Sequence, residues 1–168
     1  GYTLMDAGFA VGIYPVLGLL GAVASGVISD RLFRSDRHFP TLLYGLFNIG
    51  GMLLLFYGPG GTIDLLALGI FGFGIGGLVV FLGGLTAAEY CPRDAVGAVK
   101  GLIGLFAYMA AGLSEVVCGH LIKIEEIGGA KVYDFDHVEL FWLGMGVLSL
   151  LVALSVKFTS PGRPGEAV

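Results

Sequence analysis

Long apolar segments separated by short polar ones dominate this chain. A helix needs roughly 17–25 mostly apolar residues to span a bilayer. Segments that meet this length lie at about 7–29, 40–57, 63–90, 95–122 and 138–156. Transmembrane β-strands would show alternating segments of about ten residues, and no such alternation is visible here. The pattern therefore predicts five transmembrane helices.

The polar segments between these helices carry turn signals. Asp6 is expected to cap the first helix. Pro40 fits the first turn of the second helix, and the sequence Gly-Pro-Gly-Gly at 58–61 predicts a tight turn after it. A second proline turn is expected at 91–94, and 123–137 is predicted to be a polar loop rich in acids and glycine.

Composition supports a membrane protein. The chain is 56% hydrophobic and 13% charged, with a mean hydropathy of +0.90, whereas soluble domains carry about 25% charged residues. Too few polar residues remain to cover a large soluble core, so we predict an all-α, polytopic helix bundle. Among the 30 glycines, those spaced along one helix let backbones approach closely in a membrane. The candidates for such packing are Gly18, Gly21, Gly72, Gly76, Gly97, Gly101 and Gly104.

Basic residues predict the orientation, because cytoplasmic loops are enriched in Lys and Arg. One side of the membrane holds Arg31, Arg34, Arg37, Arg93, Lys100, Lys157 and Arg163, and the other holds only Lys123 and Lys131. The first side is expected to be cytoplasmic, which places the tail 158–168 in the cytoplasm of a multi-pass protein of the plasma (inner) membrane. Five helices then start outside, which suggests that at least one further helix precedes them in a longer protein.

Two stretches resemble a known family. Residues 26–37 read G-x-x-x-D-R-x-x-R-x-x-R, which resembles the cytoplasmic loop signature of the major facilitator superfamily. The stretch from Gly84 to Pro92, followed by a G-L-F-x-Y sequence at 104–108, is similar to helices ten and eleven of the organophosphate:phosphate antiporter group, the glycerol-3-phosphate and hexose-phosphate transporters. The resemblance covers about 6–157. It implies helices eight to twelve, most of the C-terminal half of a twelve-helix transporter.

The resemblance implies secondary transport of a small polar metabolite by alternating access, with phosphorylated metabolites among the candidates. The implied partners are a small-molecule substrate, the lipid bilayer and an N-terminal transporter half that is absent here, together with its phosphate-binding basic residues. Pro15 stands where many of these antiporters have an acid in helix eight. A sensor-like relative, another metabolite or another branch of the superfamily therefore stays open.

Two residues of the fourth segment are candidates for substrate binding or coupling. Tyr108, Gly112 and Glu115 share one helix face at i, i+4 and i+7. A carboxylate inside a membrane is costly and often functional. We expect Tyr108 to donate a hydrogen bond to the substrate and Glu115 to bind a proton or cation. Alternatively, Glu115 snorkels toward the outer surface or pairs with His120 or Lys123.

Charges at the cytoplasmic ends of the helices predict a gate. The candidates are Asp30, Arg31, Arg34, Glu89 and Arg93, and a network of such charges can break and re-form during alternating access. The alternative is that these residues simply anchor the protein at the membrane surface.

No other chemistry stands out in the sequence. We expect no catalytic residues, no metal site, no cofactor and no nucleic-acid partner. The sequence G-F-G-I-G-G at 72–77 matches a dinucleotide-binding pattern, but it lies inside an apolar segment rather than between a strand and a helix. The main alternative to a transporter is a small membrane scaffold that is complete with five helices; an intramembrane enzyme is a distant third.

Overall fold

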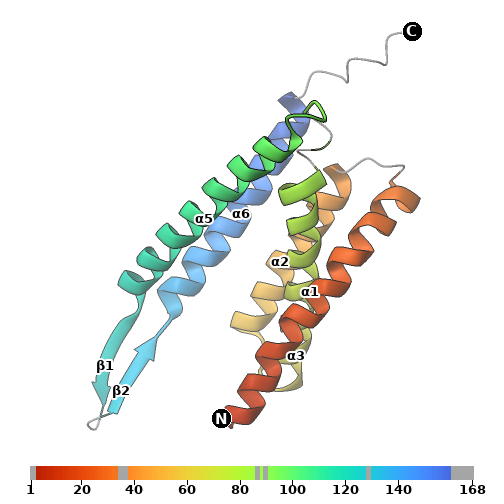
Figure 1. The fold of residues 1–168 in the computed structure, drawn as a ribbon. Helices are drawn as coiled ribbons and strands as arrows, with labels where there is room; N and C mark the ends of the chain where they lie inside the picture. Colours follow the sequence, from red (N-terminus) through yellow and green to blue (C-terminus); the bar gives the residue numbers. More distant parts are fainter. Residues whose placement is uncertain (1–2, 34–37, 86–87, 89–90, 128–129, 160–168) are drawn as a thin grey trace.

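A computed structural model describes residues 3–33, 38–85, 88, 91–127 and 130–159 of the chain. It consists of long helices and one two-stranded hairpin (Figure 1). The helices are α1 (Leu4–Leu32), α2 (His38–Tyr57), α3 (Thr62–Val80), the short π-helix η1 (Phe81–Leu85), α5 (Val96–Leu121) and α6 (Asp136–Thr159). The strands are β1 (Lys123–Ile127) and β2 (Ala130–Asp134).

Five helices of the described chain are long and apolar enough to cross a membrane. They match the five predicted segments, so the prediction of an all-α polytopic bundle is confirmed. Large apolar side chains on these helices are exposed, for example Phe9 at 74%, Leu19 at 68% and Leu113 at 67%. Such exposure suits lipid, because apolar side chains are at home in hydrocarbon and a helix makes its backbone hydrogen bonds within the segment that crosses it.

The first helix begins with a capping box. The Thr3 side chain accepts a hydrogen bond from the Asp6 N–H (3.2 Å), and the Asp6 carboxylate accepts one from the Thr3 N–H (3.3 Å). Thr3 is therefore the N-cap, and Asp6 is its reciprocal partner rather than the cap. Between α2 and α3, Gly60 and Gly61 have φ angles of 84° and 70°, which only glycine adopts without strain. They make the turn that the Gly-Pro-Gly-Gly sequence predicts.

Helix α3 lies against both α1 and α2, and glycines set how closely it approaches them. Toward α1, a Cβ atom at Gly72 would meet the Tyr14 carbonyl, and one at Gly76 would meet the Gly18 carbonyl. Toward α2, a Cβ atom at Gly74 would lie 2.8 Å from the Asn48 nitrogen. Two faces of α3 are therefore used at once, and only glycine fits at these contacts.

The aromatic side chain of Tyr44 fills the centre of this three-helix unit. Tyr44 is fully buried on α2, and its hydroxyl donates a hydrogen bond to the Gly21 carbonyl of α1 (3.3 Å). Its ring stacks on Phe73 at a centroid distance of 5.3 Å and meets the edge of Phe81 at 5.7 Å. A Cβ atom at Gly77 would overlap the same ring. One tyrosine thus joins α1, α2, α3 and η1.

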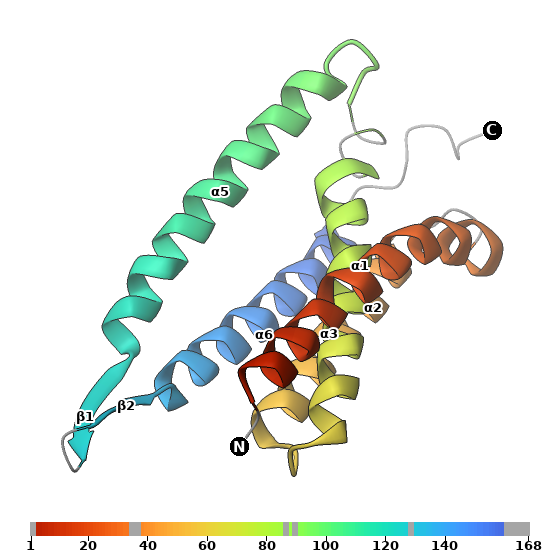
Figure 2. The ribbon, with the colours of Figure 1, turned by 60° about the horizontal axis from the view of Figure 1, so that its bottom comes forward.

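The last two helices form an arm that is attached to the three-helix unit through α6. Helix α6 packs on α2, where a Cβ atom at Gly45 would meet the Leu150 side chain at 3.1 Å. Helix α5 meets α6 near the hairpin and diverges from it toward the other end (Figure 2). At the near end, the Trp142 indole N–H donates to the Cys118 sulfur (3.1 Å). Most of α5 therefore has no cover from the described parts of α1, α2 and α3.

The prediction of a loop at 123–137 is wrong for most of these residues. Strands β1 and β2 pair there as an antiparallel hairpin. The strands begin and end within two residues of α5 and α6, so the hairpin ties the two helix ends together. Opposite pairs in its register are Lys123 with Asp134, Ile124 with Tyr133, Glu125 with Val132, and Glu126 with Lys131.

Candidate functional site

One face of α5 carries both candidate substrate residues. Because α5 is a single helix from Val96 to Leu121, positions three or four residues apart stack on one side of it. The residues that follow this spacing are Gly97, Gly101, Gly104, Tyr108, Gly112, Glu115 and Gly119. We call this row the α5 stripe. It combines one phenol and one carboxylate with five residues that have no side chain.

The α5 stripe is open in the described chain. Tyr108 is 83% exposed and Glu115 is also exposed. A Cβ atom at Gly97, Gly101, or Gly104 would meet nothing within 4 Å. These predicted packing glycines therefore touch no described helix, in contrast to Gly18, Gly21, Gly72 and Gly76, which lie against backbone atoms between α1 and α3.

The structure describes three of the five residues of the predicted gate. Asp30 and Arg31 are exposed in the last turn of α1, where a cation suits the negative end of the helix. Arg93 is exposed in the turn before α5. Arg34 and Glu89 lie outside the described residues. Lys100 of α5 reaches back toward η1, since its Nζ atom would lie 3.8 Å from a Cβ atom at Gly84.

The π-helix η1 was not predicted from the sequence, which indicated one continuous helix at 63–90. Phe81–Leu85 continues α3 with a wider turn, and Phe81 is fully buried against Tyr44. Single π-turns in helices often occur at functional sites. The available signal was the pair Gly83–Gly84, which lowers helix propensity inside an otherwise continuous apolar segment.

The cavities in the described chain differ in their chemistry. A cavity of about 60 Å³ lies among α2, α3 and α6, and its lining includes the polar side chains of Thr41, Asn48 and Ser149. Two larger hollows, of about 530 and 270 Å³, are lined almost wholly by apolar groups, the first along α1 and the second among α1, α2 and α3. Among the described residues, no group of three His, Cys, Asp or Glu could hold a metal ion.

Known proteins resemble the whole length of this chain. It is 34% identical over 172 residues to the membrane sensor protein UhpC of Salmonella typhimurium, a match that covers 99% of the chain. It is also 30% identical over 125 residues, or 73% of the chain, to the glycerol-3-phosphate transporter of Bacillus subtilis. The chain is homologous to members of the organophosphate:phosphate antiporter group of the major facilitator superfamily. The predicted family is thereby confirmed.

The antiporter-group relatives are much longer than this chain. It spans 36% of the Salmonella sensor and 28% of the Bacillus transporter. A probable hexose phosphate transport protein of Chlamydia pneumoniae, 27% identical over 77% of the chain, is likewise matched over 28% of its length. No protein-family model matches the chain. The membrane-spanning helices and these relatives together establish a multi-pass integral membrane protein.

Proposed function

We propose that this chain is part of a secondary transporter that moves a small phosphorylated metabolite across the membrane by alternating access. The observation that carries the proposal is the similarity to a glycerol-3-phosphate transporter and a hexose phosphate transport protein, extending over about three quarters of the chain. The five helices correspond to helices eight to twelve, and residues 1–157 to most of a C-terminal half. The partner is an N-terminal half with its own membrane helices.

The α5 stripe supplies one wall of the proposed substrate site. In such folds the site lies near the bilayer midplane between two repeats, so residues that serve it must be uncovered within either half alone. Tyr108 meets this condition, because it is 83% exposed on a membrane helix. Its hydroxyl can donate a hydrogen bond to a phosphate or hydroxyl oxygen of the substrate.

Glu115 has a different role in the proposed site. An ionised carboxylate repels a phosphate, so Glu115 does not bind that group directly. Two turns along the same face from Tyr108, it is placed to take up a proton or to pair with a basic residue of the other half. Either arrangement lowers the cost of a carboxylate inside the membrane.

The proposed gate lies near the N-terminal end of α5, at the other end of the helix from Glu115. Asp30, Arg31, Arg34, Glu89 and Arg93 would form ion pairs that hold the cytoplasmic side closed in one state. Such pairs suit a gate because exposed ion pairs are worth only about 0–1 kcal/mol each, so substrate binding can overcome them. This assignment places the gate and the C-terminus in the cytoplasm of a cell with the protein in its inner membrane.

A sensor is the second candidate function. The two sensor proteins named UhpC, from Salmonella typhimurium and Escherichia coli, match 99% of the chain at 34% and 33% identity. The glycerol-3-phosphate transporter and the hexose phosphate transport protein reported above match 73% and 77% of it. In a sensor the same site would bind the phosphorylated ligand, and binding would change the conformation without net turnover. A transporter and a sensor would therefore bind the same class of ligand, but only the transporter would move it across the membrane.

Counterflow in proteoliposomes tests the proposal. The full-length protein is reconstituted in vesicles loaded with unlabelled glycerol 3-phosphate or glucose 6-phosphate, and uptake of the labelled compound is followed beside binding to the detergent-solubilised protein. We expect uptake of a phosphorylated compound and none of glycerol or glucose. Binding without uptake would favour the sensor, and the absence of both would contradict the proposed ligand class and favour a scaffold.

Substitution of Tyr108 tests the site within that assay. Tyr108→Phe removes one hydrogen bond to a charged ligand, worth about 1.5–3 kcal/mol, so affinity should fall roughly 10- to 150-fold. The matched control is Tyr57→Phe, at the exposed end of α2, which should bind like the wild type. Equal affinity of the two variants would remove Tyr108 from the site.

A further inference from the structure

The hairpin β1–β2 has two chemically different faces. Opposite residues of an antiparallel pair share a face, and successive residues alternate. One face therefore carries Ile124 with Tyr133 and, two residues farther out, Glu126 with Lys131. The other face carries Lys123 with Asp134, Glu125 with Val132 and Ile127 with Ala130. We call the first the Ile124 face.

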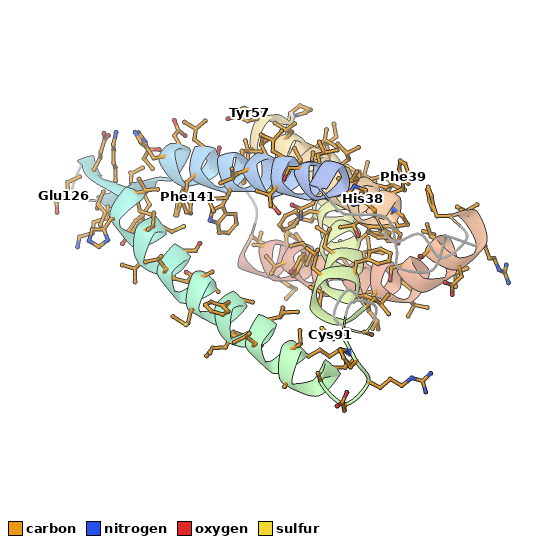
Figure 3. All side chains as sticks on the ribbon, turned by 90° about the horizontal axis from the view of Figure 1, so that it is seen from above. His38, Phe39, Tyr57, Cys91, Glu126 and Phe141 are labelled. Atoms are coloured by element: carbon orange, nitrogen blue, oxygen red, sulfur yellow. The ribbon has the colours of Figure 1, made fainter. Side chains whose placement is uncertain are left out.

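Polarity changes along the Ile124 face in step with distance from the helices. The pair Ile124–Tyr133 lies next to the ends of α5 and α6, and both side chains are more than half exposed, at 58% and 52%. Phe135, 48% exposed, continues the apolar surface toward α6. The charged pair Glu126–Lys131 lies at the remote end, where Figure 3 shows Glu126. On the other face the order is reversed, with the charged pair Lys123–Asp134 beside the helices and the apolar pair Ile127–Ala130 at the remote end.

This order matches the polarity of a membrane interface. Two residues along a strand span about 7 Å, which is close to the thickness of one headgroup layer, roughly 5–7 Å on each side of the hydrocarbon core. An apolar pair at the helix ends would therefore reach the acyl boundary while the charged pair stays among headgroups. Tyrosine is enriched at that depth in membrane proteins.

No described helix of the bundle covers the hairpin. In Figures 1 and 2 it extends from α5 and α6 and stands clear of α1, α2 and α3. Its surface is continuous with the lipid-exposed helices, because β1 begins two residues after α5 ends and β2 ends two residues before α6 begins. Among the described residues, α1, α2 and α3 therefore supply no apolar surface to Ile124 and Tyr133.

We propose that the Ile124 face lies on the bilayer interface, with Ile124, Tyr133 and Phe135 in contact with lipid and Lys131 among the lipid phosphates. The face that carries Glu125 and Val132 is turned to water. The hairpin then fixes the depth of the joined ends of α5 and α6. This inference rests on the membrane-spanning helices and is independent of whether the protein transports or senses.

Spin-label accessibility tests the inference in the full-length protein, reconstituted in vesicles of phosphatidylethanolamine and phosphatidylglycerol. In a variant without other cysteines, Ile124→Cys and Tyr133→Cys are labelled with a nitroxide, and Val132→Cys is the matched control. Molecular oxygen concentrates in lipid and a charged nickel chelate stays in water. We expect the labels at 124 and 133 to relax several-fold more with oxygen than with nickel, and the label at 132 to show the reverse.

Two results would overturn the proposal. Equal nickel accessibility at 124, 132 and 133 would mean that the hairpin stands in water. Low accessibility to both reagents at 124 and 133 would mean that protein rather than lipid covers this face. Because the two test residues lie on different strands, loss of one variant by misfolding leaves the other to decide. Neither result bears on uptake or binding of a phosphorylated compound, so the proposed function is judged separately.

Discussion

At the scale of single residues, glycine acts in two opposite ways in this protein. In α3, Gly72, Gly74 and Gly76 lie directly against backbone atoms of α1 and α2. In α5, the glycines of the α5 stripe face open space. The residue type is the same, and the neighbour decides whether an added methyl group would clash. In membranes, where no hydrophobic effect drives helices together, such close contacts supply much of the association.

Gly76→Ala should therefore destabilise the α1–α3 contact. The new methyl group would run into the Gly18 carbonyl and lie 2.9 Å from the Gly18 Cα atom, and backbone atoms cannot move aside as a side chain can. Overpacking of this kind costs about 1–3 kcal/mol. Thermal unfolding of the detergent-solubilised full-length protein measures it. Gly50→Ala in α2, where a Cβ atom meets nothing within 4 Å, is the control and should unfold like the wild type.

Glu115→Gln should flatten the pH dependence of uptake. Glutamine keeps the size and polarity of the side chain but cannot take up a proton, so any proton coupling through this position is lost. Uptake of labelled glycerol 3-phosphate across a pH series measures the effect. Glu126→Gln on the exposed hairpin is the control. An unchanged profile for Glu115→Gln would assign that residue to snorkelling or pairing alone.

At the scale of elements, the hairpin and the Trp142–Cys118 hydrogen bond hold α5 to α6 at one end only. The other end of α5 meets η1 through Lys100. A helix held at its two ends and uncovered along its length can present its stripe to a partner.

The residues at 128–129 are both glycine, and a Gly-Gly pair between short alternating segments is a known hairpin signal. The sequence therefore contained a signal for the hairpin, but the acidic, glycine-rich composition of 123–137 favoured the prediction of a loop.

Disulfide trapping tests the register of the hairpin. Glu126→Cys combined with Lys131→Cys places two thiols on directly opposite residues, where Cβ atoms are about 4.5–5.5 Å apart and can be bridged by a mild oxidant. The mismatched pair Glu126→Cys with Val132→Cys places the thiols on opposite faces and should stay reduced. Mass spectrometry of the oxidised protein counts the bridged fraction. Similar bridging in both pairs would indicate a loop without fixed register.

At the scale of the whole molecule, the described chain is a three-helix unit with an arm, and the arm leaves the α5 stripe bare. Helices α1, α2 and α3 make their closest backbone contacts with one another. The glycines of α5 make no such contact with the described residues. This division is expected if a second part of the protein faces α5 across a substrate site. The relatives, of which the chain spans 28–36%, have ample length for such a part.

Cysteine accessibility tests this arrangement in the assembled protein. Gly112→Cys lies on the α5 stripe, and Leu113→Cys lies one residue on and faces another direction, where Leu113 is 67% exposed. We expect a charged thiol reagent to modify the cysteine at 112 through an aqueous cavity and to leave the one at 113 unmodified in lipid. Glycerol 3-phosphate should protect the cysteine at 112. Equal modification at both positions would contradict a cavity along the stripe.

The sequence by itself determined the number of membrane helices, the approximate bounds of each and the family, because these depend on local apolar length and on short motifs such as the charged loop after α1. It also placed Tyr108 and Glu115 on one helix face, since helical spacing alone fixes that. Tertiary structure decided the rest. It showed that glycines of α3 pack while those of α5 do not, and that Tyr44 joins four elements. Each of these depends on which residues from distant parts of the chain become neighbours, and no local pattern contains that information.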